Sequence, residues 1–286
     1  MKLYSTIGTA VLASAACALL SLTQVINGDK PTADQATVSA TTEQATETTT
    51  LYTYDTSVLS NEKFGWYFMP NDEHKTPAVK SGIDYAAYSA YYVGDTSEKV
   101  IYLTFDEGYE NGYTSKILDV LKQKNVKAAF FVTESYIKSN LELVKRMQAE
   151  GHTVGNHSIK HLSSPDLSDE ELFYEINETA WTYKKLTGFD MPKVFRPPMG
   201  EYSERTLAVA HNMGYKTIFW SFAYKDWETD NQPGKQAAYD TVMSRYHNGA
   251  ILLLHAVSSS NTEALPDIID SLTEAGYRFG TLDELG

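Results

Sequence analysis

The stretch IYLTFDEGYENG (residues 101–112) decides how the rest of this 286-residue sequence is interpreted. An apolar run rich in β-branched and aromatic residues ends in two adjacent carboxylates, Asp106 and Glu107, followed by a glycine. Such a run predicts a buried strand over residues 100–105, with charge placed where that strand ends. In α/β barrels this is the edge at which active sites assemble.

Short apolar runs alternate with segments of helical period from residue 100 onward. Strands are predicted over residues 100–105, 126–132, 152–155, 194–196, 216–221, 250–255 and 277–282. Between two of them, Ser168-x-x-Glu171 predicts a capping box and Gly188 the end of the same helix. Regular β then α alternation favours parallel strands with right-handed crossovers. The fold class is therefore predicted to be α/β, a distorted (β/α) barrel of about seven units.

Four regions follow from changes in composition. Residues 1–26 carry a lysine and then an apolar run, which predicts a signal peptide, or a membrane anchor if it stays uncleaved. Residues 27–52, rich in Thr, Ala, Gln and Glu, predict a disordered linker. Residues 53–99 bring aromatics without a period and predict an irregular N-terminal cover, and residues 100–286 predict the catalytic domain. The protein is expected to be secreted or associated with the cell envelope.

Charge and cysteine content exclude some classes of protein. The formal net charge is -13 and the sequence pI is near 5.0, which argues against nucleic acid as a partner. Cys17 is the one cysteine and lies in the predicted signal, so the exported domain has no internal disulfide. Its stability must come from core packing or a bound metal, and it is expected to be a monomer.

Polar residues recur at the carboxyl ends of the predicted strands. In order along the chain they are Asp106 and Glu107, Asn156 and His157, Arg196, Asp226, and His255. A scatter of loop charges does not place five such sets on one rim. This convergence predicts catalysis.

Each set read alone also has an ordinary explanation. His157 and His161 are four residues apart, so one helical turn would let both rings share a metal at about 2.0 to 2.1 Å, but such pairs also occur on solvated surfaces. Arg196 precedes two prolines that stiffen the backbone and aim its guanidinium, or it is a surface arginine at a strand end. Asp226 precedes Trp227, which suits stacking on a sugar or plain packing. His255 ends a buried strand, and a lone histidine in such a place is more often a core residue than a catalyst.

Taken in order, TFDEG, HSIKH, RPPMG, the KDW segment and LLLH resemble the five motifs of the polysaccharide deacetylases, the NodB-homology group of carbohydrate esterase family 4. The resemblance covers residues 100–285, and GYENGYTSKILDVL, FWSFAYKDW and LLLHAVSSSNTEAL are similar to its PdaA-type branch of peptidoglycan N-acetylmuramic acid deacetylases. It implies a distorted barrel with fewer than eight units and a peptidoglycan glycan strand as partner. It also implies muramic δ-lactam synthesis in spore cortex, and a divalent metal ion with zinc as first candidate.

The resemblance implies the acid–base roles. Asp106 matches the general base that takes a proton from the attacking water, and Arg196 the residue that orients it. His255 matches the general acid, oriented by Asp226. Amide hydrolysis needs these functions and stabilisation of an oxyanion.

The resemblance also implies the binding residues. His157 and His161 match the metal ligands, and Glu107 occupies the position of the third. The substrate-binding residues are expected to be Trp227, Leu253, Pro197 and Tyr202.

Glu107 departs from the family pattern, which usually reads Thr-Phe-Asp-Asp-Gly, and the PdaA-type branch itself commonly has Asn at this position. A glutamate can still ligate if the backbone or rotamer adjusts; otherwise two histidines and water hold the ion more weakly. Three hypotheses therefore stand: N-deacetylation of muramic acid in peptidoglycan, deacetylation of N-acetylglucosamine in wall glycan or chitin-like polymers, and a catalytically silent wall-glycan-binding protein.

Overall fold

The computed structural model describes residues 53–79 and 82–286. The predicted signal or anchor and the predicted linker lie outside these ranges. Residues Thr53–Gly286 form one compact unit. No helix in the described part of the chain is long and apolar enough to cross a membrane.

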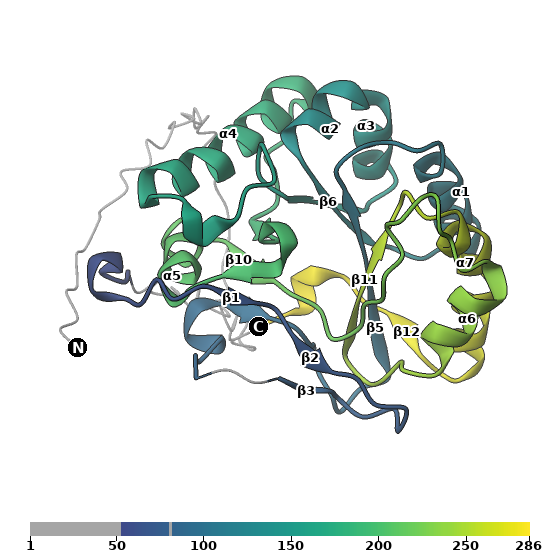
Figure 1. Cartoon of the computed structure of the whole chain (residues 1–286). Helices are drawn as coiled ribbons and strands as arrows, with labels where there is room; N and C mark the ends of the chain where they lie inside the picture. Colours follow the sequence, from purple (N-terminus) through teal and green to yellow (C-terminus); the bar gives the residue numbers. More distant parts are fainter. Residues whose placement is uncertain (1–52, 80–81) are drawn as a thin grey trace, which may run out of the picture. The chain divides into compact units, whose positions relative to one another are not determined.

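The central element is a sheet of parallel strands, so the predicted α/β class is confirmed (Figure 1). Its order is β11-β5-β6-β7-β8-β10-β4, and β12 pairs with the beginning of β5. The bounds are β4 Ala90–Tyr91, β5 Val100–Glu107, β6 Ala129–Val132, β7 Thr153–Asn156, β8 Val194–Phe195, β10 Lys216–Ile218, β11 Ala250–His255 and β12 Arg278–Phe279. All seven predicted strands are present.

The sheet curls and closes irregularly, as a distorted barrel. Its two end strands, β4 and β11, are joined where Val93 bridges Ala250, and Phe222 after β10 bridges Leu252. The strand β4 comes from the segment predicted to be an irregular cover. That segment therefore contributes to the barrel wall as well as covering it.

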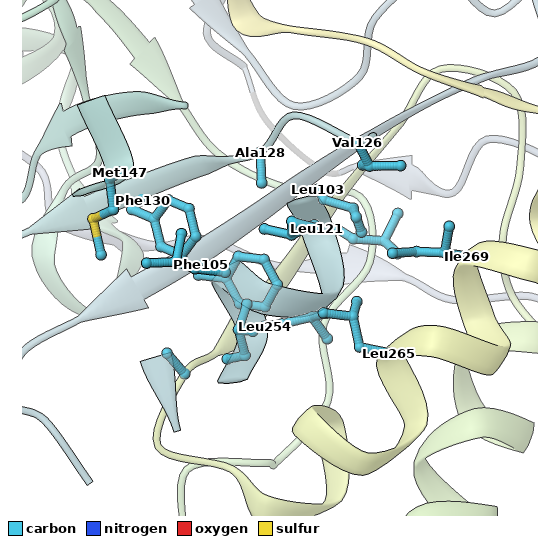
Figure 2. Packing of buried hydrophobic residues seen from close by; sticks show 14 of the residues in the cluster. Leu103, Phe105, Leu121, Val126, Ala128, Phe130, Met147, Leu254, Leu265 and Ile269 are labelled. Atoms are coloured by element: carbon cyan, nitrogen blue, oxygen red, sulfur yellow. The ribbon is translucent and has the colours of Figure 1, made fainter. Parts of the chain in front are cut away.

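The strands bury both faces, which explains their nearly continuous apolar sequences. On β5, Val100 and Tyr102 belong to a cluster in the barrel interior, whereas Leu103 and Phe105 belong to the larger cluster between sheet and helices. Figure 2 shows the outer cluster, in which Phe105 stacks on Phe130 at 5.2 Å between ring centroids. Side chains alternate between the two faces along the whole strand.

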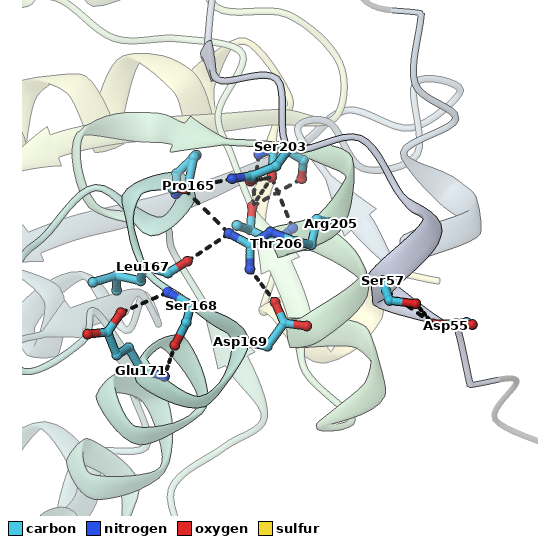
Figure 3. Close-up of polar contacts among 11 residues, drawn as sticks. Asp55, Ser57, Pro165, Leu167, Ser168, Asp169, Glu171, Ser203, Arg205 and Thr206 are labelled. Atoms are coloured by element: carbon cyan, nitrogen blue, oxygen red, sulfur yellow. Dashed lines mark hydrogen bonds and ion pairs between the residues drawn. The ribbon is translucent and has the colours of Figure 1, made fainter.

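Helices cover the outside of the sheet. They are α1 Thr114–Lys124, α2 Glu134–Ser139, α3 Leu141–Ala149, α4 Asp169–Thr187, α5 Glu204–Asn212, α6 Lys235–Met243 and α7 Ser259–Glu274. The capping box of Ser168 and Glu171 opens α4, and Gly188 closes it with a left-handed backbone, φ 83°. Figure 3 shows the start of α4 tied to α5, where Arg205 donates to the Leu167 carbonyl at 2.7 Å and pairs with Asp169.

Short elements complete the unit. They are η1 Thr56–Val58, η2 Ala86–Tyr88, η3 Ser164–Asp166, η4 Pro198–Gly200 and η5 Leu282–Glu284, with the antiparallel pairs β1 Phe64–Gly65 to β9 Glu201–Tyr202 and β2 Phe68–Met69 to β3 Ala78–Val79. Between β1 and β2, the Trp66 ring stacks on Phe219 at 4.3 Å and its Nε1 donates to the Trp220 carbonyl at 2.9 Å. The N-terminal cover thereby contacts the residues that directly follow the carboxyl end of β10.

Candidate active site

Asp106 forms a buried ion pair with Arg196. The Arg196 Nη1 donates to Asp106 Oδ1 at 2.7 Å, and its Nε donates to the Ile218 carbonyl at 3.0 Å. The guanidinium is fully buried and lies 4.2 Å from the centroid of the Phe131 ring. Burial alone would raise the pKa of Asp106, but Arg196, His157 and His255 together hold it below the ordinary value. The carboxylate is therefore ionised at neutral pH and suited to accept a proton.

His255 forms a second pair, with Asp226. Asp226 is fully buried, and its Oδ1 lies 2.6 Å from His255 Nδ1. Its Oδ2 accepts from the His255 backbone N at 2.8 Å and from Asn261 Nδ2 at 2.5 Å. Burial would lower the pKa of His255, but the hydrogen bond and charge of Asp226 raise it above the ordinary value. The ring is consequently suited to donate a proton from Nε2.

The two pairs come together because their strands are neighbours. Asp106 and His255 are direct register partners on β5 and β11. Both open onto one cavity of about 380 Å³. Its lining consists of Asp106, His161, Met199, Gly200, Trp220, Trp227, Leu253 and His255. A carboxylate with a lowered pKa and an imidazole with a raised pKa therefore face a single cavity with aromatic walls.

His157 and His161 also lie together, but not on the helical turn that the sequence predicts. Their ring centroids are 4.8 Å apart, whereas the segment between them is irregular, with Ser158 at φ 67° and His161 at φ 56°. His157 Nδ1 donates to the Arg196 carbonyl at 2.8 Å, which leaves Nε2 free of its proton and 3.6 Å from Asp106 Oδ2. Burial lowers the pKa of His157 to about 4, so the ring is neutral at physiological pH.

Glu107 lies on the other side of the strand. The strand β5 continues two residues past its predicted end, and Glu107 pairs in register with Val132. Alternation then turns its side chain away from that of Asp106. The fully buried Glu107 carboxyl accepts from Thr114 Oγ1 at 3.2 Å, and burial raises its pKa well above the ordinary value. The structure therefore does not place Glu107 with the histidines as the sequence predicts for a ligand.

A divalent ion fits this site only in part. His157 offers an unprotonated Nε2 oriented by a carbonyl on its other nitrogen, as metal-bound histidines typically do. However, no cluster of three or more His, Cys, Asp or Glu side chains able to hold an ion occurs within residues 53–79 and 82–286. The protein would hold an ion through His157 and His161, with water completing the coordination.

The expected substrate residues divide into two groups. Trp227, half exposed, and Leu253 line the cavity, and the Trp227 ring meets His255 edge-on at 5.4 Å. Tyr202 is instead 3% exposed, with its hydroxyl 2.6 Å from that of Tyr85 and its ring against Phe219. Its predicted role in substrate binding is not supported by that position.

Pro197 is buried directly before η4 and does not line the cavity. Met199 and Gly200 of the same RPPMG motif line it instead. Sequence reasoning also missed Trp220 and Asn261. Both lie within stretches quoted for the resemblance, FWSFAYKDW and LLLHAVSSSNTEAL, but their type alone gave no reason to select them. Asn261 donates to the Asp226 carboxylate, which in turn bonds the His255 ring.

A sequence model described as polysaccharide deacetylase matches residues 93–218. The peptidoglycan-N-acetylmuramic acid deacetylase PdaA of Bacillus subtilis is 43% identical over 229 residues, 79% of this chain and 87% of that protein. Its solved structure superposes with a TM-score of 0.77 over 79% of this chain and 98% of that one. The chain belongs to the polysaccharide deacetylase family, carbohydrate esterase family 4.

Two further relatives of this polysaccharide deacetylase family member differ in their described activity. A peptidoglycan-N-acetylglucosamine deacetylase of Bacillus cereus is 34% identical over 194 residues, 66% of this chain and 89% of that protein. A solved carbohydrate esterase family 4 pseudoenzyme from Bacillus anthracis is 33% identical, with a TM-score of 0.64 over 68% of each chain. Enzymes of this family are generally metal-dependent.

Proposed function

We propose that this family member hydrolyses the N-acetyl group of N-acetylmuramic acid in peptidoglycan, supplying a step of muramic δ-lactam synthesis in spore cortex. The observation that carries the proposal is that Asp106, paired with Arg196, and His255, paired with Asp226, are register partners on neighbouring strands and line one cavity. The relative named for muramic acid is also more similar to this chain than the relative named for glucosamine.

The proposed reaction needs one water molecule and two proton transfers. Asp106 takes a proton from the water as the water oxygen attacks the acetyl carbonyl carbon. Arg196 holds the Asp106 carboxylate in place. The tetrahedral intermediate then breaks its carbon–nitrogen bond while His255 Nε2 gives a proton to the departing nitrogen. Acetate and the free amine of the sugar leave. Asp226 keeps the His255 ring oriented and stabilises its protonated form.

A divalent ion, with zinc as first candidate, is proposed to bind at His157 and His161. When bound, it would polarise the acetyl carbonyl and stabilise the oxyanion. The sugar is proposed to lie against Trp227 and Leu253, which face the hollow beside the acid histidine. We further propose that the protein acts as a monomer outside the cytoplasm, with membrane attachment only if its N-terminal segment stays uncleaved.

The test is to incubate the purified protein with defined glycan strands, with and without Zn²⁺, and to weigh the products. Loss of acetyl groups from muramic residues alone is the expected result. Loss from glucosamine residues would favour the second candidate, for which the Bacillus cereus relative is the supporting observation. Binding with no loss from any glycan would contradict the proposal and favour a silent wall-binding protein, as the likeness to a pseudoenzyme allows.

A further inference from the structure

The segment that joins β7 to η3 has a backbone that its residue types do not favour. Ser158 and His161 both adopt left-handed conformations, at φ 67° and 56°, although neither is glycine. Such conformations persist only when the surroundings hold them in place. Because the segment carries both His157 and His161, whatever holds the backbone also sets the distance between the two rings.

Glu175 supplies two of the bonds that hold this segment. Its Oε2 accepts from the backbone N–H groups of Ile159 and Lys160, each at 2.9 Å. Glu175 is only 4% exposed. Both bonds thus lie between the two histidines, at the centre of the irregular segment.

The bonding pattern matches an anion held by backbone. Successive N–H groups next to a left-handed residue form a concave nest that favours negative charge. None of the ion pairs found among the described residues includes Glu175, so the observed partners of this buried carboxyl are the two amides rather than a cation. Removing the carboxylate would leave two inward-facing amides unpaired, which destabilises this particular backbone.

The carboxylate is presented by a firmly placed helix. The helix α4 starts with the capping box of Ser168 and Glu171, and Arg205 of α5 secures its first turn through Asp169 (Figure 3). Ile176, the next residue, accepts at its carbonyl from Asn156 Nδ2 at 2.8 Å, which fixes α4 to the end of β7. Glu175 therefore extends from one fixed element to a segment that has no regular structure.

We propose that Glu175 is a positioning residue that holds the His161 ring at its observed position beside His157, and that it thereby sets the divalent-ion affinity of the site. It acts through the backbone and touches none of the reacting atoms. The inference rests on the proposed function, since it takes the two histidines as the ion ligands.

The variants separate reach from charge. Glu175→Asp keeps the charge but withdraws the oxygen by one methylene, so it cannot hold both amides. Glu175→Gln keeps the reach, and its amide oxygen still accepts both bonds. Glu178→Asp, three residues further along the same helix, is the matched control. Each variant is titrated with Zn²⁺ by calorimetry, and amide exchange at Ile159 and Lys160 and the His161 ring resonances are recorded in the metal-free protein.

We expect Glu175→Asp to weaken Zn²⁺ binding about tenfold or more, the usual effect of losing a group that orients a ligand. It should also unprotect both amides and shift the His161 ring resonances. Glu175→Gln and the control should stay near wild type in all three measurements. Unprotected amides with unchanged His161 resonances and unchanged affinity would overturn the proposal, since Glu175 would then be purely structural.

The test also distinguishes this inference from the proposed function. If wild-type protein binds no Zn²⁺, the ion site fails and the ion-affinity part of the inference is overturned with it. If wild type binds Zn²⁺ but deacetylates no glycan, the reaction fails while the role of Glu175 is still decided by the affinity and the resonances. If Zn²⁺ binding in Glu175→Asp equals that of wild type, only the inference fails.

Discussion

Asp106 is a charged residue that its neighbours largely bury. Its carboxylate is 9% exposed, and the fully buried Arg196 at 2.7 Å carries the compensating charge. Breaking such a pair from one side is costly because the other charge remains buried and unpaired. The same pairing keeps the Asp106 carboxylate ionised, so stability and the proposed chemistry depend on one contact.

Replacing Asp106 by Asn should therefore affect both properties. Under the proposed mechanism, activity should fall about 10²-fold or more, because the base is lost. The chain should still fold, at a lower melting temperature, since Asn can accept one bond from Arg196. Initial rates on a glycan substrate measure the activity, and a thermal melt measures the melting temperature. Near-wild-type turnover would remove Asp106 from the role of base.

The pH dependence should be controlled by Asp226 through His255. The folded-state pKa of His255 lies above its ordinary value, so the acid form is present at low pH and is lost as pH rises through that raised pKa. Asp226→Asn removes the charge that raises it and leaves the burial that lowers it. The basic limb of the rate profile should move to lower pH. If the basic limb stays at the same pH in Asp226→Asn, it reports the titration of a group other than His255.

Under the proposed mechanism, the limb at low pH should belong to Asp106, whose folded pKa is depressed. Its ionised form, with the pairing that stabilises the fold, is lost only as pH falls through a value below the ordinary 3.8. We therefore expect activity to persist to mildly acidic pH in wild type.

Glu107 should not contribute to ion binding. Its carboxyl is bonded to Thr114 on the helix side of β5, so Glu107→Asp and Glu107→Ala should bind Zn²⁺ as wild type does. Both should instead lower the melting temperature, Ala more than Asp, because Thr114 loses a buried partner. Metal titration and thermal melts of the three proteins decide this. Weaker Zn²⁺ binding in Glu107→Ala alone would restore the ligand role.

At the scale of elements, the strands were predictable and their exact ends were not. Apolar runs with clear breaks identified the strands, but carboxylates at 106 and 107 signalled an end that the structure places after Glu107. Because pairing continues through Glu107, alternation along the strand places its side chain on the face opposite that of Asp106. The histidine segment was likewise predicted as a turn of helix from spacing alone. Instead, the Asn156 side chain accepts from the Ser158 N–H two residues further on, and Glu175, 16 residues after Ile159, accepts from the Ile159 N–H, and these bonds hold a different backbone.

Gly155 shows how β7 depends on a missing side chain. A Cβ there would lie 2.6 Å from the Phe131 ring and 3.1 Å from Val194. Phe131 supports the Arg196 guanidinium, so Gly155→Ala should displace it and destabilise the fold by about 1 to 3 kcal/mol. Denaturant unfolding measures this. Gly65→Ala, where the added Cβ meets nothing within 4 Å, is the control, and equal stability of the two variants would contradict the argument.

At the scale of the whole molecule, the barrel was predictable from the β and α alternation but its closure was not. The strand β4 has two residues, too few to give a sequence signal. The bridges from Val93 and Phe222 depend on where the sheet ends meet. Similarly, the motifs selected Asp106 and His255, which the structure brings to one cavity, whereas Met199, Trp220 and Asn261 acquire their positions only when distant strands come together.

The N-terminal cover should consequently matter for both stability and activity. The Trp66 ring stacks on Phe219 and its Nε1 donates to the Trp220 carbonyl, while its backbone N–H donates to the Gly200 carbonyl at 2.8 Å. Gly200 and Trp220 both line the cavity. Trp66→Ala should therefore destabilise the fold by about 2 kcal/mol or more, as expected for loss of a packed aromatic, and should raise KM on glycan.

The neighbouring Tyr67 offers a matched control, because its side chain is 64% exposed. Tyr67→Ala should leave both the melting temperature and KM close to wild type, since it removes little packed surface. Trp66→Phe should fall between the two, because it keeps the stacking on Phe219 but loses the bond to Trp220. If Trp66→Ala instead melts and turns over like Tyr67→Ala, the segment before β4 is a dispensable cover, and the cavity wall is held by the barrel strands alone.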